Sequence, residues 1–278
     1  MTFHEVGVEV QDARAAATFA ARGRWRRPRP ADWMIRVASI VIVLGLWELF
    51  GPSMNRVFLR PPSQIAMAFV DLLGTGELQT ALVQSLRVFG VGLAIAIVAG
   101  IFIGIVMGRS RIAFNILDPW VSALYSVPSV ALLPLVAVAF NYSGDPPRIA
   151  AVVLFAIFPI LINTQQGVRN VDPMLMEVAR AFNTSERRLW SDVIVPSALP
   201  FILAGVRLSI GRALIGMIVA EFLIGLAGLG YLIIVYQNTF RIDRMFVPVI
   251  LVATIGIVLM GLVQIIEGRV APWLRREQ

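Results

Sequence analysis

Six runs of apolar residues, most of them long enough to cross a bilayer, dominate this chain of 278 residues. A transmembrane helix needs about 20 predominantly apolar residues, so the first and fourth runs are near the short limit. Hydrophobic residues make up 58% of the sequence, above the ~45–50% of globular proteins. The sequence therefore predicts an all-α, polytopic membrane protein with six transmembrane helices. The runs lie at roughly 33–50, 86–107, 119–140, 148–166, 199–224 and 245–266.

The residue types that the chain lacks exclude several kinds of chemistry. It has no cysteine, one histidine (His4), and no lysine among its 24 basic residues. Without lysine it cannot form a phosphate-binding P-loop or a Schiff base, and without cysteine it has no disulfide or thiolate metal site. A single histidine in a polar tail argues against a Ser–His–Asp triad or a histidine metal site. We therefore expect no catalytic residue and no bound metal in this chain.

The arginines predict the orientation. If the N-terminus is inside, the inner segments carry 16 arginines, counting Arg36, the outer segments carry 6, and Arg207 and Arg212 lie within the fifth run. Basic residues are enriched on the cytoplasmic side of membrane proteins, so both termini are predicted to be cytoplasmic. The same bias explains the net charge of +7 without a nucleic-acid partner.

These predictions divide the chain into three parts. Residues 1–32 form a cytoplasmic tail that lacks the marks of a cleavable signal, residues 33–268 form the six-span domain, and residues 269–278 form a second tail. The outer segment 51–85 contains FLRPPSQIAMAFVDLL, which predicts a short helix on the membrane surface. The glycine-rich outer segment 225–244 lacks a dinucleotide-binding spacing, so we expect it to serve packing or gating.

Small residues recur at every fourth position of the second run, and a shorter series occurs on the fifth. Such ridges let helix backbones approach closely, either within one subunit or at a seam between subunits. The first series is Gly92, Ala96, Gly100, Gly104 and Gly108, and the second is Gly205, Ser209 and Ala213.

The inner loop 167–198 is polar but patterned like two short helices. Asp172 is predicted to cap the first helix, with Pro173 at its first position. Asn183 is expected either to close that helix in the left-handed conformation or to cap the second helix together with Glu186. Pro196, with Pro200, is predicted to stop the second helix and to bend the chain into the fifth run. The apolar face of the first helix is predicted to hold Met174, Leu175, Val178, Ala179 and Phe182.

Two interpretations of this loop are open: an amphipathic segment that rests on lipid headgroups, and a docking surface of fixed shape. The internal capping favours the second. The spacing also resembles the EAA loop of ABC importer permeases, EAA-x3-G-x9-I-x-L-P, because Glu177-Val178-Ala179 is followed by Asn183 and then by Val193-Ile194-Val195-Pro196. Valine stands in place of the first alanine of the family pattern, and Asn183 stands in place of its glycine. After glycine, asparagine is the residue best tolerated in the left-handed region, so the turn can be kept.

In that family the loop forms coupling helices that sit in a groove of a separate ATP-binding subunit. The resemblance therefore implies a coupling role for the residues of this loop. They are Glu177, Val178, Ala179, Ala181, Phe182, Asn183, Arg187, Leu189, Trp190 and Pro196.

Further segments are similar to the nitrate/sulfonate/taurine/bicarbonate branch of these permeases: LRPPSQIAMAF, VPSVALLPLVAVAF, LINTQQGVRNVDPMLMEVARAF and VIVPSALPFILAGVRLSIGRALIGMIVAEFLIGLAGLGYLI. The resemblance implies a type I, MetI-like permease in the bacterial inner membrane that moves a small anion. It implies two ATP-binding subunits, a second permease copy or paralogue, and an extracytoplasmic substrate-binding protein. ATP and magnesium would be bound by the ATPase subunits, so no cofactor is expected in this chain.

A permease needs a polar route, and three runs offer one. Four polar residues share a face of the third run, close to Pro128 and Pro134, which are expected to kink it. The alternative for the serines is that their hydroxyls bond to backbone carbonyls of the preceding helical turn and serve packing alone. The alternative for the polar end of the fourth run is a helix end at the membrane interface. Arg212, with Ser209, is expected to face the pathway and offer positive potential to an anion. The alternative is a structural pairing of Arg212 or Arg207 with a carboxylate such as Glu48 or Glu221. The predicted pathway residues are Ser122, Tyr125, Ser126, Ser129, Asn163, Gln166, Ser209, Arg212 and Glu221.

Two other function classes compete with an importer. An intramembrane enzyme lacks its catalytic groups here, because the histidine is in the tail and no aspartate lies near the centre of a run. Against a channel or a stand-alone secondary carrier, the sequence has no carbonyl-filter signature of potassium channels and few charged residues for the relay of a proton-coupled carrier. Co-purification distinguishes these classes, since an importer permease should bring ATPase subunits with it.

Overall fold

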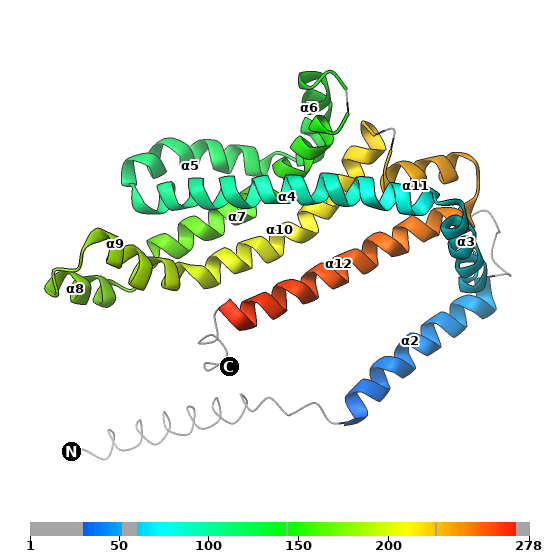
Figure 1. Ribbon diagram of the computed structural model, residues 1–278, viewed down its shortest axis with the longest axis horizontal. Helices are drawn as coiled ribbons and strands as arrows, with labels where there is room; N and C mark the ends of the chain where they lie inside the picture. The colour runs from blue at the N-terminus through cyan, green and yellow to red at the C-terminus, as the bar shows by residue number, and fades with distance from the viewer. Residues whose placement is uncertain (1–29, 52–59, 143, 226, 271–278) are drawn as a thin grey trace, which may run out of the picture. The chain divides into compact units, whose positions relative to one another are not determined.

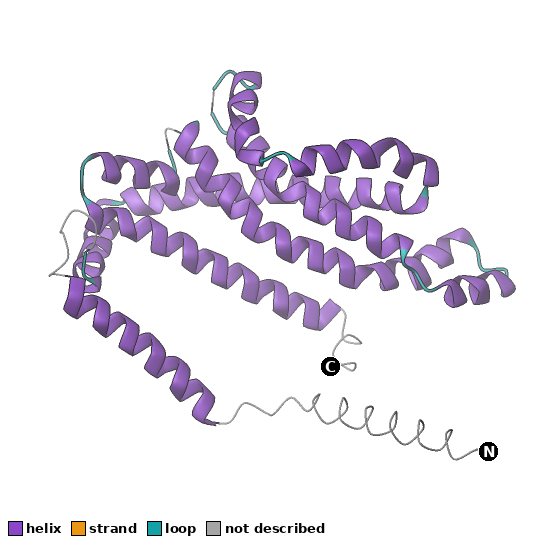
Figure 2. Ribbon diagram, turned by 180° about the vertical axis from the view of Figure 1, so that it is seen from behind, coloured by secondary structure: helices purple, strands orange, loops and turns teal. Residues whose placement is uncertain are grey.

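The computed structural model describes residues 30–51, 60–142, 144–225 and 227–270, and these residues form helices and short connections without a strand (Figures 1 and 2). The chain divides into two units, Met1–Arg56 and Val57–Gln278. In the first unit the described helix is α2 (Pro30–Phe50), whose segment Trp33–Phe50 is apolar enough to span a membrane. The predicted tails lie almost entirely outside the described residues.

The second unit contains the other described helices. Candidate membrane spans are Glu77–Arg109, Pro146–Arg169, Glu186–Leu223 and Ile242–Arg269, and the bent pair Arg111–Ser126 and Ser129–Ala139 counts as a sixth span if its two parts are joined. Five of the six predicted runs thus correspond to single described helices, and the third corresponds to the bent pair. In chain order the second unit holds α3 (Pro62–Thr75), α4 (Glu77–Arg109), α5 (Arg111–Ser126), η2 (Ser129–Leu132), α6 (Leu133–Ala139), α7 (Pro146–Arg169), α8 (Pro173–Ala181), α9 (Glu186–Arg188), η3 (Leu189–Ile194), α10 (Val195–Leu223), α11 (Leu229–Asn238) and α12 (Ile242–Val270).

Helix α7 lies between α4 and α10 and packs along both of them (Figure 1). The small residues of α4 make this possible, because a β-carbon at Gly108 would lie 2.6 Å from Cβ of Val168 and one at Gly104 would lie 2.7 Å from the carbonyl oxygen of Leu161. On the other side, Ser209 of α10 is fully buried and donates to the carbonyl of Ala156 at 2.6 Å. Both small-residue ridges therefore pack within one subunit.

The third apolar run is not one helix. Helix α5 ends at Ser126, and the axis turns by 96° before η2 and α6 begin. Val127 is extended, with φ −74° and ψ 132°, as expected for a residue that precedes proline. The predicted kink at Pro128 is therefore a complete break. Ser129 lies beyond this break, so it does not share the helical face of Ser126 that the sequence pattern predicted.

The predicted short helix in the first outer segment is α3, which starts with Pro62 at its first position and buries Ile65, Ala68 and Leu72. Its C-terminus is closed by Gly76 in the left-handed conformation, with φ 74°. Helix α11 (Leu229–Asn238) fills the middle of the glycine-rich outer segment and packs against α12, α10 and α4. The described parts of these two outer segments are thus largely helical and packed against the spans.

Candidate functional site

The first helix of the inner loop, α8, forms as its capping signals predict. Asp172 accepts a hydrogen bond from the backbone N–H of Met174 at 2.8 Å, and Pro173 occupies the first position. At the other end, Asn183 has φ 46°, with its N–H bonded to the carbonyl of Arg180 and the next N–H, of Thr184, bonded to Ala179. This is a Schellman-type closure. Asparagine therefore serves in the left-handed turn where the family pattern has glycine.

Helix α8 has one buried contact and an exposed apolar row. Ala179 is buried against Val168, Leu189, Ile194 and Ala198, which anchors the helix to the ends of α7 and α10. The other apolar residues of the predicted face are exposed: Met174 at 71%, Leu175 at 48%, Val178 at 49% and Phe182 at 80%. The predicted apolar face is thus divided, because Ala179 points into the protein while its neighbours point out. Among the other predicted coupling residues, Glu177, Ala181, Asn183 and Arg187 are exposed, Trp190 and Pro196 are half-buried, and Leu189 is buried.

Of the two roles predicted for Asn183, the structure shows the closure of α8 and not the cap of the second inner helix. The N-cap of that helix is Ser185, and Glu186 approaches Arg109 at 3.5 Å instead of bonding back to the cap. Pro196 does not stop the helix, since Glu186–Leu223 is one continuous span. The π-helical segment η3 precedes Pro196, and the N–H of Val195 bonds to the carbonyl of Trp190. This wider turn lets the chain pass the proline, which has no N–H to donate, so the helix continues.

Four of the nine predicted pathway residues, Ser122, Tyr125, Ser126 and Arg212, lie at one place. The guanidinium of Arg212, on α10, donates to the hydroxyl of Tyr125 on α5 at 2.9 Å and lies 5.0 Å from the centre of its ring. Ser122 and Ser126 are exposed on the same helix, and the hydroxyl of Ser126 donates to the carbonyl of Ser122. This cluster joins two helices that are far apart in the sequence.

The remaining pathway residues lie elsewhere. Asn163 is half-buried and donates to Pro159 within its own helix at 2.8 Å, and Gln166 is exposed near the inner end of α7. Ser209 and Glu221 are buried at 0% and 1% exposure, so neither shares the exposed face of Arg212. Their assignment to the pathway stays a prediction, and their contacts are those of helix packing and loop anchoring.

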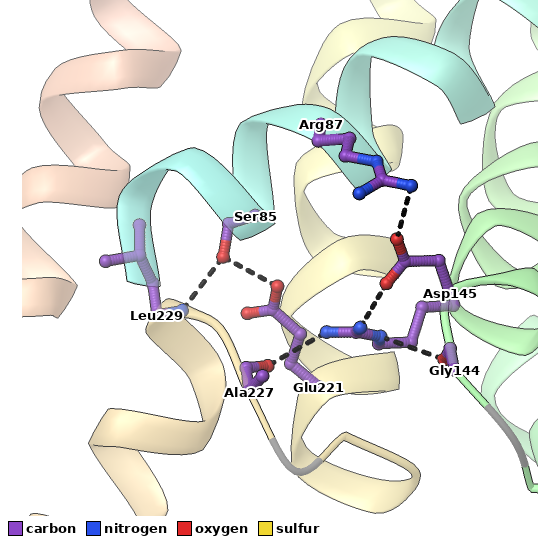
Figure 3. A network of polar contacts seen from close by, with 8 residues as sticks. Ser85, Arg87, Gly144, Asp145, Glu221, Ala227 and Leu229 are labelled. Carbon is purple, nitrogen blue, oxygen red and sulfur yellow. Dashed lines mark hydrogen bonds and ion pairs between the residues drawn. The ribbon is translucent and has the colours of Figure 1, made fainter. Parts of the chain in front are cut away.

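Glu221 anchors the outer end of the bundle (Figure 3). One carboxylate oxygen accepts from the hydroxyl of Ser85 at 2.6 Å, and the other accepts from the backbone N–H of Gly230 at 2.7 Å. The Ser85 hydroxyl also accepts from the N–H of Leu229 at 2.8 Å. Gly228 has φ 104°, and a β-carbon there would collide with the Glu221 carboxylate. The glycines of this segment therefore let the backbone pass directly over a buried carboxylate.

A second set of contacts holds the same region. Arg148 is 7% exposed, forms an ion pair with Asp145 and donates to the carbonyl of Ala227 at 3.0 Å (Figure 3). Asp145 also lies 3.3 Å from Arg87. Helices α4, α7 and α10 and the start of α11 are thus joined at their outer ends by polar contacts.

Sequence reasoning missed most of these partners. It considered Glu48 and Glu221 for the arginines of the fifth run, whereas Arg207 pairs with Glu267 of α12. The role of Ser85 could not be predicted, because a single serine at the start of an apolar run is usual.

A further outer pair joins Tyr236 of α11 to Glu77 at 2.8 Å. Burial, together with this bond to a carboxylate, raises the pKa of Tyr236 to about 12.

Comparison with known proteins decides the family. The model of the family described as "binding-protein-dependent transport system inner membrane component" matches residues 96–272. The chain belongs to this family. It is a multi-pass inner-membrane permease subunit of a bacterial ABC importer, and permeases of this kind work with ATP-binding and substrate-binding partners.

Named relatives cover nearly the whole chain. The putative aliphatic sulfonates transport permease protein SsuC of Bacillus subtilis (strain 168) is 32% identical over 87% of this chain and 88% of that protein. The nitrate import permease protein NrtB of Leptolyngbya laminosa is 33% identical over 84% and 86%. Among solved structures, an amino acid ABC transporter with histidines matches 76% of this chain and 98% of its own chain, with a TM-score of 0.57 and 20% identity, which supports the fold.

Proposed function

We propose that this permease imports a small anion, as one of two permease subunits driven by two ATP-binding subunits. Support for the solute class comes from two of the relatives, whose names concern aliphatic sulfonates and nitrate. Both solutes carry a negative charge spread over several oxygens. We take the second permease subunit to be another copy of this chain, and the subunit composition of the purified complex would reveal a paralogue instead.

The exposed apolar row of α8 carries the proposal that this helix docks on an ATP-binding subunit. Met174, Val178 and Phe182 expose 71%, 49% and 80% of their surface on a helix that Ala179 anchors from the other side. A protein surface seldom leaves such a row uncovered unless a partner binds it. Because capping and the buried Ala179 hold the helix in place before binding, the helix loses little conformational entropy when a partner binds it.

The same arrangement supports a route for coupling. Helix α8 packs against the start of the continuous helix Glu186–Leu223, whose outer end carries Glu221. Closure of two ATPase subunits would move two copies of α8 together, and the spans would switch access as rigid bodies between two states. A loaded binding protein on the outer side would bias the same equilibrium.

The coupling proposal can be tested by charge substitution on α8. The complex is produced with its ATP-binding subunits, carrying Glu177→Arg or Phe182→Asp, and co-purification and stimulated ATP hydrolysis are measured. We expect either variant to lose the ATPase subunits or to separate hydrolysis from uptake. Asp71→Arg is the matched control, because Asp71 lies on the outer helix α3 and its pair with Arg244 is long, at 3.8 Å. Normal co-purification together with normally coupled hydrolysis in both α8 variants would show that α8 is not the docking element.

A further inference from the structure

Arg212 is a charged residue in an unusual setting. It lies near the middle of α10, within the candidate span Glu186–Leu223, and yet its side chain is exposed on the surface of this subunit. A charge at this depth cannot face hydrocarbon cheaply, so such residues face a neighbouring protein or a water-filled cavity. The face that carries Arg212 is therefore turned away from lipid in the working complex.

No carboxylate among the described residues forms an ion pair with Arg212. The candidates on nearby helices are engaged elsewhere, since Glu267 pairs with Arg207 and Glu221 is held by Ser85 and Gly230. A carboxylate beside Arg212 would cancel its charge and repel an incoming anion. The structure instead leaves the positive charge of this guanidinium without a negative partner in the part of the chain that it describes.

Tyr125 holds the guanidinium without neutralising it. The phenol oxygen accepts one N–H at 2.9 Å, and the ring lies within cation–π distance, at 5.0 Å. Phe158 supports the ring of Tyr125, with a centroid separation of 5.9 Å. Because the phenol oxygen accepts from arginine, its own O–H is free to donate onward, and such a chain of bonds strengthens each donor.

The surroundings of this pair suit a solute route. Helix α5 has no buried residue, and Ser122 and Ser126 are exposed on it beside Tyr125. The helix then ends at the 96° break before η2. Irregular backbone at membrane depth is found where it is buried in protein or lines a water-filled cavity, and broken helices are common at transporter solute sites.

We propose that Arg212 and Tyr125 form a contact site for the oxygens of the transported anion, an inference that rests on the proposed import of an anion. The planar guanidinium offers paired N–H donors that match two oxygens of a nitrate or a sulfonate. The Tyr125 hydroxyl supplies a further donor. One arginine with one phenol binds weakly, as transport requires, because a solute must leave the site as readily as it enters.

Uptake by the complete complex tests the site. Wild-type and variant complexes, with ATP-binding subunits and binding protein, are reconstituted in liposomes, and ATP-dependent uptake of a sulfonate and of nitrate is measured alongside subunit composition. Arg212→Gln should lower uptake by about 10- to 100-fold, the loss expected for a charge-assisted contact, while the complex stays assembled. Tyr125→Phe, which keeps the ring, should lower it by about threefold to tenfold. Arg241→Gln, the same change at an exposed outer residue, should leave uptake unchanged.

A second measurement does not depend on uptake. The chain has no cysteine, so Ser122→Cys introduces a single thiol beside the pair. In the assembled complex, a negatively charged thiol reagent should modify this position faster than a positively charged one. Adding Arg212→Gln should reduce that preference, because the local positive charge is gone, and a saturating sulfonate should protect the thiol.

The outcomes separate this inference from the function on which it rests. Failure of the wild-type complex to take up either anion would overturn both. Normal wild-type uptake with Arg212→Gln within twofold of it would overturn the anion site alone. If Arg212→Gln fails to assemble, Tyr125→Phe and the thiol reagents decide. Equal modification of Ser122→Cys by both reagents, without protection, would refute the site.

Discussion

Ser85→Ala tests whether the outer network holds the four helices together. The substitution removes one hydroxyl that is fully buried and serves two partners, the carboxylate of Glu221 at 2.6 Å and the N–H of Leu229 at 2.8 Å. A hydrogen bond to a charged group contributes about 1.5–3 kcal/mol, and a neutral one about 1 kcal/mol. Because both partners stay buried, we expect the free energy of unfolding to fall by about 2.5–4 kcal/mol.

Thermal unfolding of the detergent-solubilised protein measures this loss. For a folded unit of this size, each kcal/mol of lost stability lowers Tm by about 2–4 °C, so we expect the Tm of Ser85→Ala to fall by about 5–15 °C. Thr254→Val is the matched control, because the Thr254 hydroxyl is exposed and bonds only to Ile250 of its own helix, at 2.8 Å. A Ser85→Ala variant whose Tm matches that of Thr254→Val would show that the network adds nothing to stability.

Two further predictions concern packing and pH. Gly104→Ala should destabilise the protein by about 1–3 kcal/mol, because the added methyl group meets α7. Gly90→Ala in the same helix meets nothing within 4 Å and should be neutral or slightly stabilising. Thermal unfolding of the two variants checks this, and equal Tm values would contradict the close packing of α4 on α7. Burial, and then the bond with Glu77, raises the pKa of Tyr236 from about 10 in the unfolded chain to about 12 in the folded protein. The protonated phenol in this site therefore favours folding fully below pH 10, and this contribution is lost as pH rises through 12. Tyr236→Phe should remove that part of the decline in Tm between pH 10 and 12, and an unchanged decline would be evidence against it.

The helices of this protein were largely predictable, because hydrophobic runs and capping residues act locally. Asp172, Pro173 and Asn183 determine the ends of α8 through bonds within a few residues, and each behaves as its chemistry predicts. Pro196 was misjudged, since proline in isolation signals a stop, whereas the π-helical turn before it lets the helix continue. Whether Pro128 kinks or breaks its helix depends on packing around it, which the sequence pattern does not contain.

The polar contacts were harder to predict for a different reason. Ser85 and Glu221 are 136 residues apart, and their bond depends on how three helices pack. Arg212 was identified because a charged side chain inside a membrane is energetically unfavourable. Its partner Tyr125 was predicted only as a pathway residue and not as a contact of Arg212. Long-range pairs of this kind arise from tertiary structure, so a single sequence indicates which residues need a partner without indicating the partner.

The continuous helix from Glu186 to Leu223 has a mechanical consequence. Its 38 residues amount to a rod of about 57 Å, roughly twice the thickness of the hydrocarbon core. Tilting such a rod by about 5° about one end displaces the other by about 5 Å, given its length. The π-helical turn at η3 and the proline at position 200 are the places where it would bend rather than transmit force. A force applied at the inner end therefore reaches Glu221, which binds the outer loop, only to the extent that these two places stay rigid.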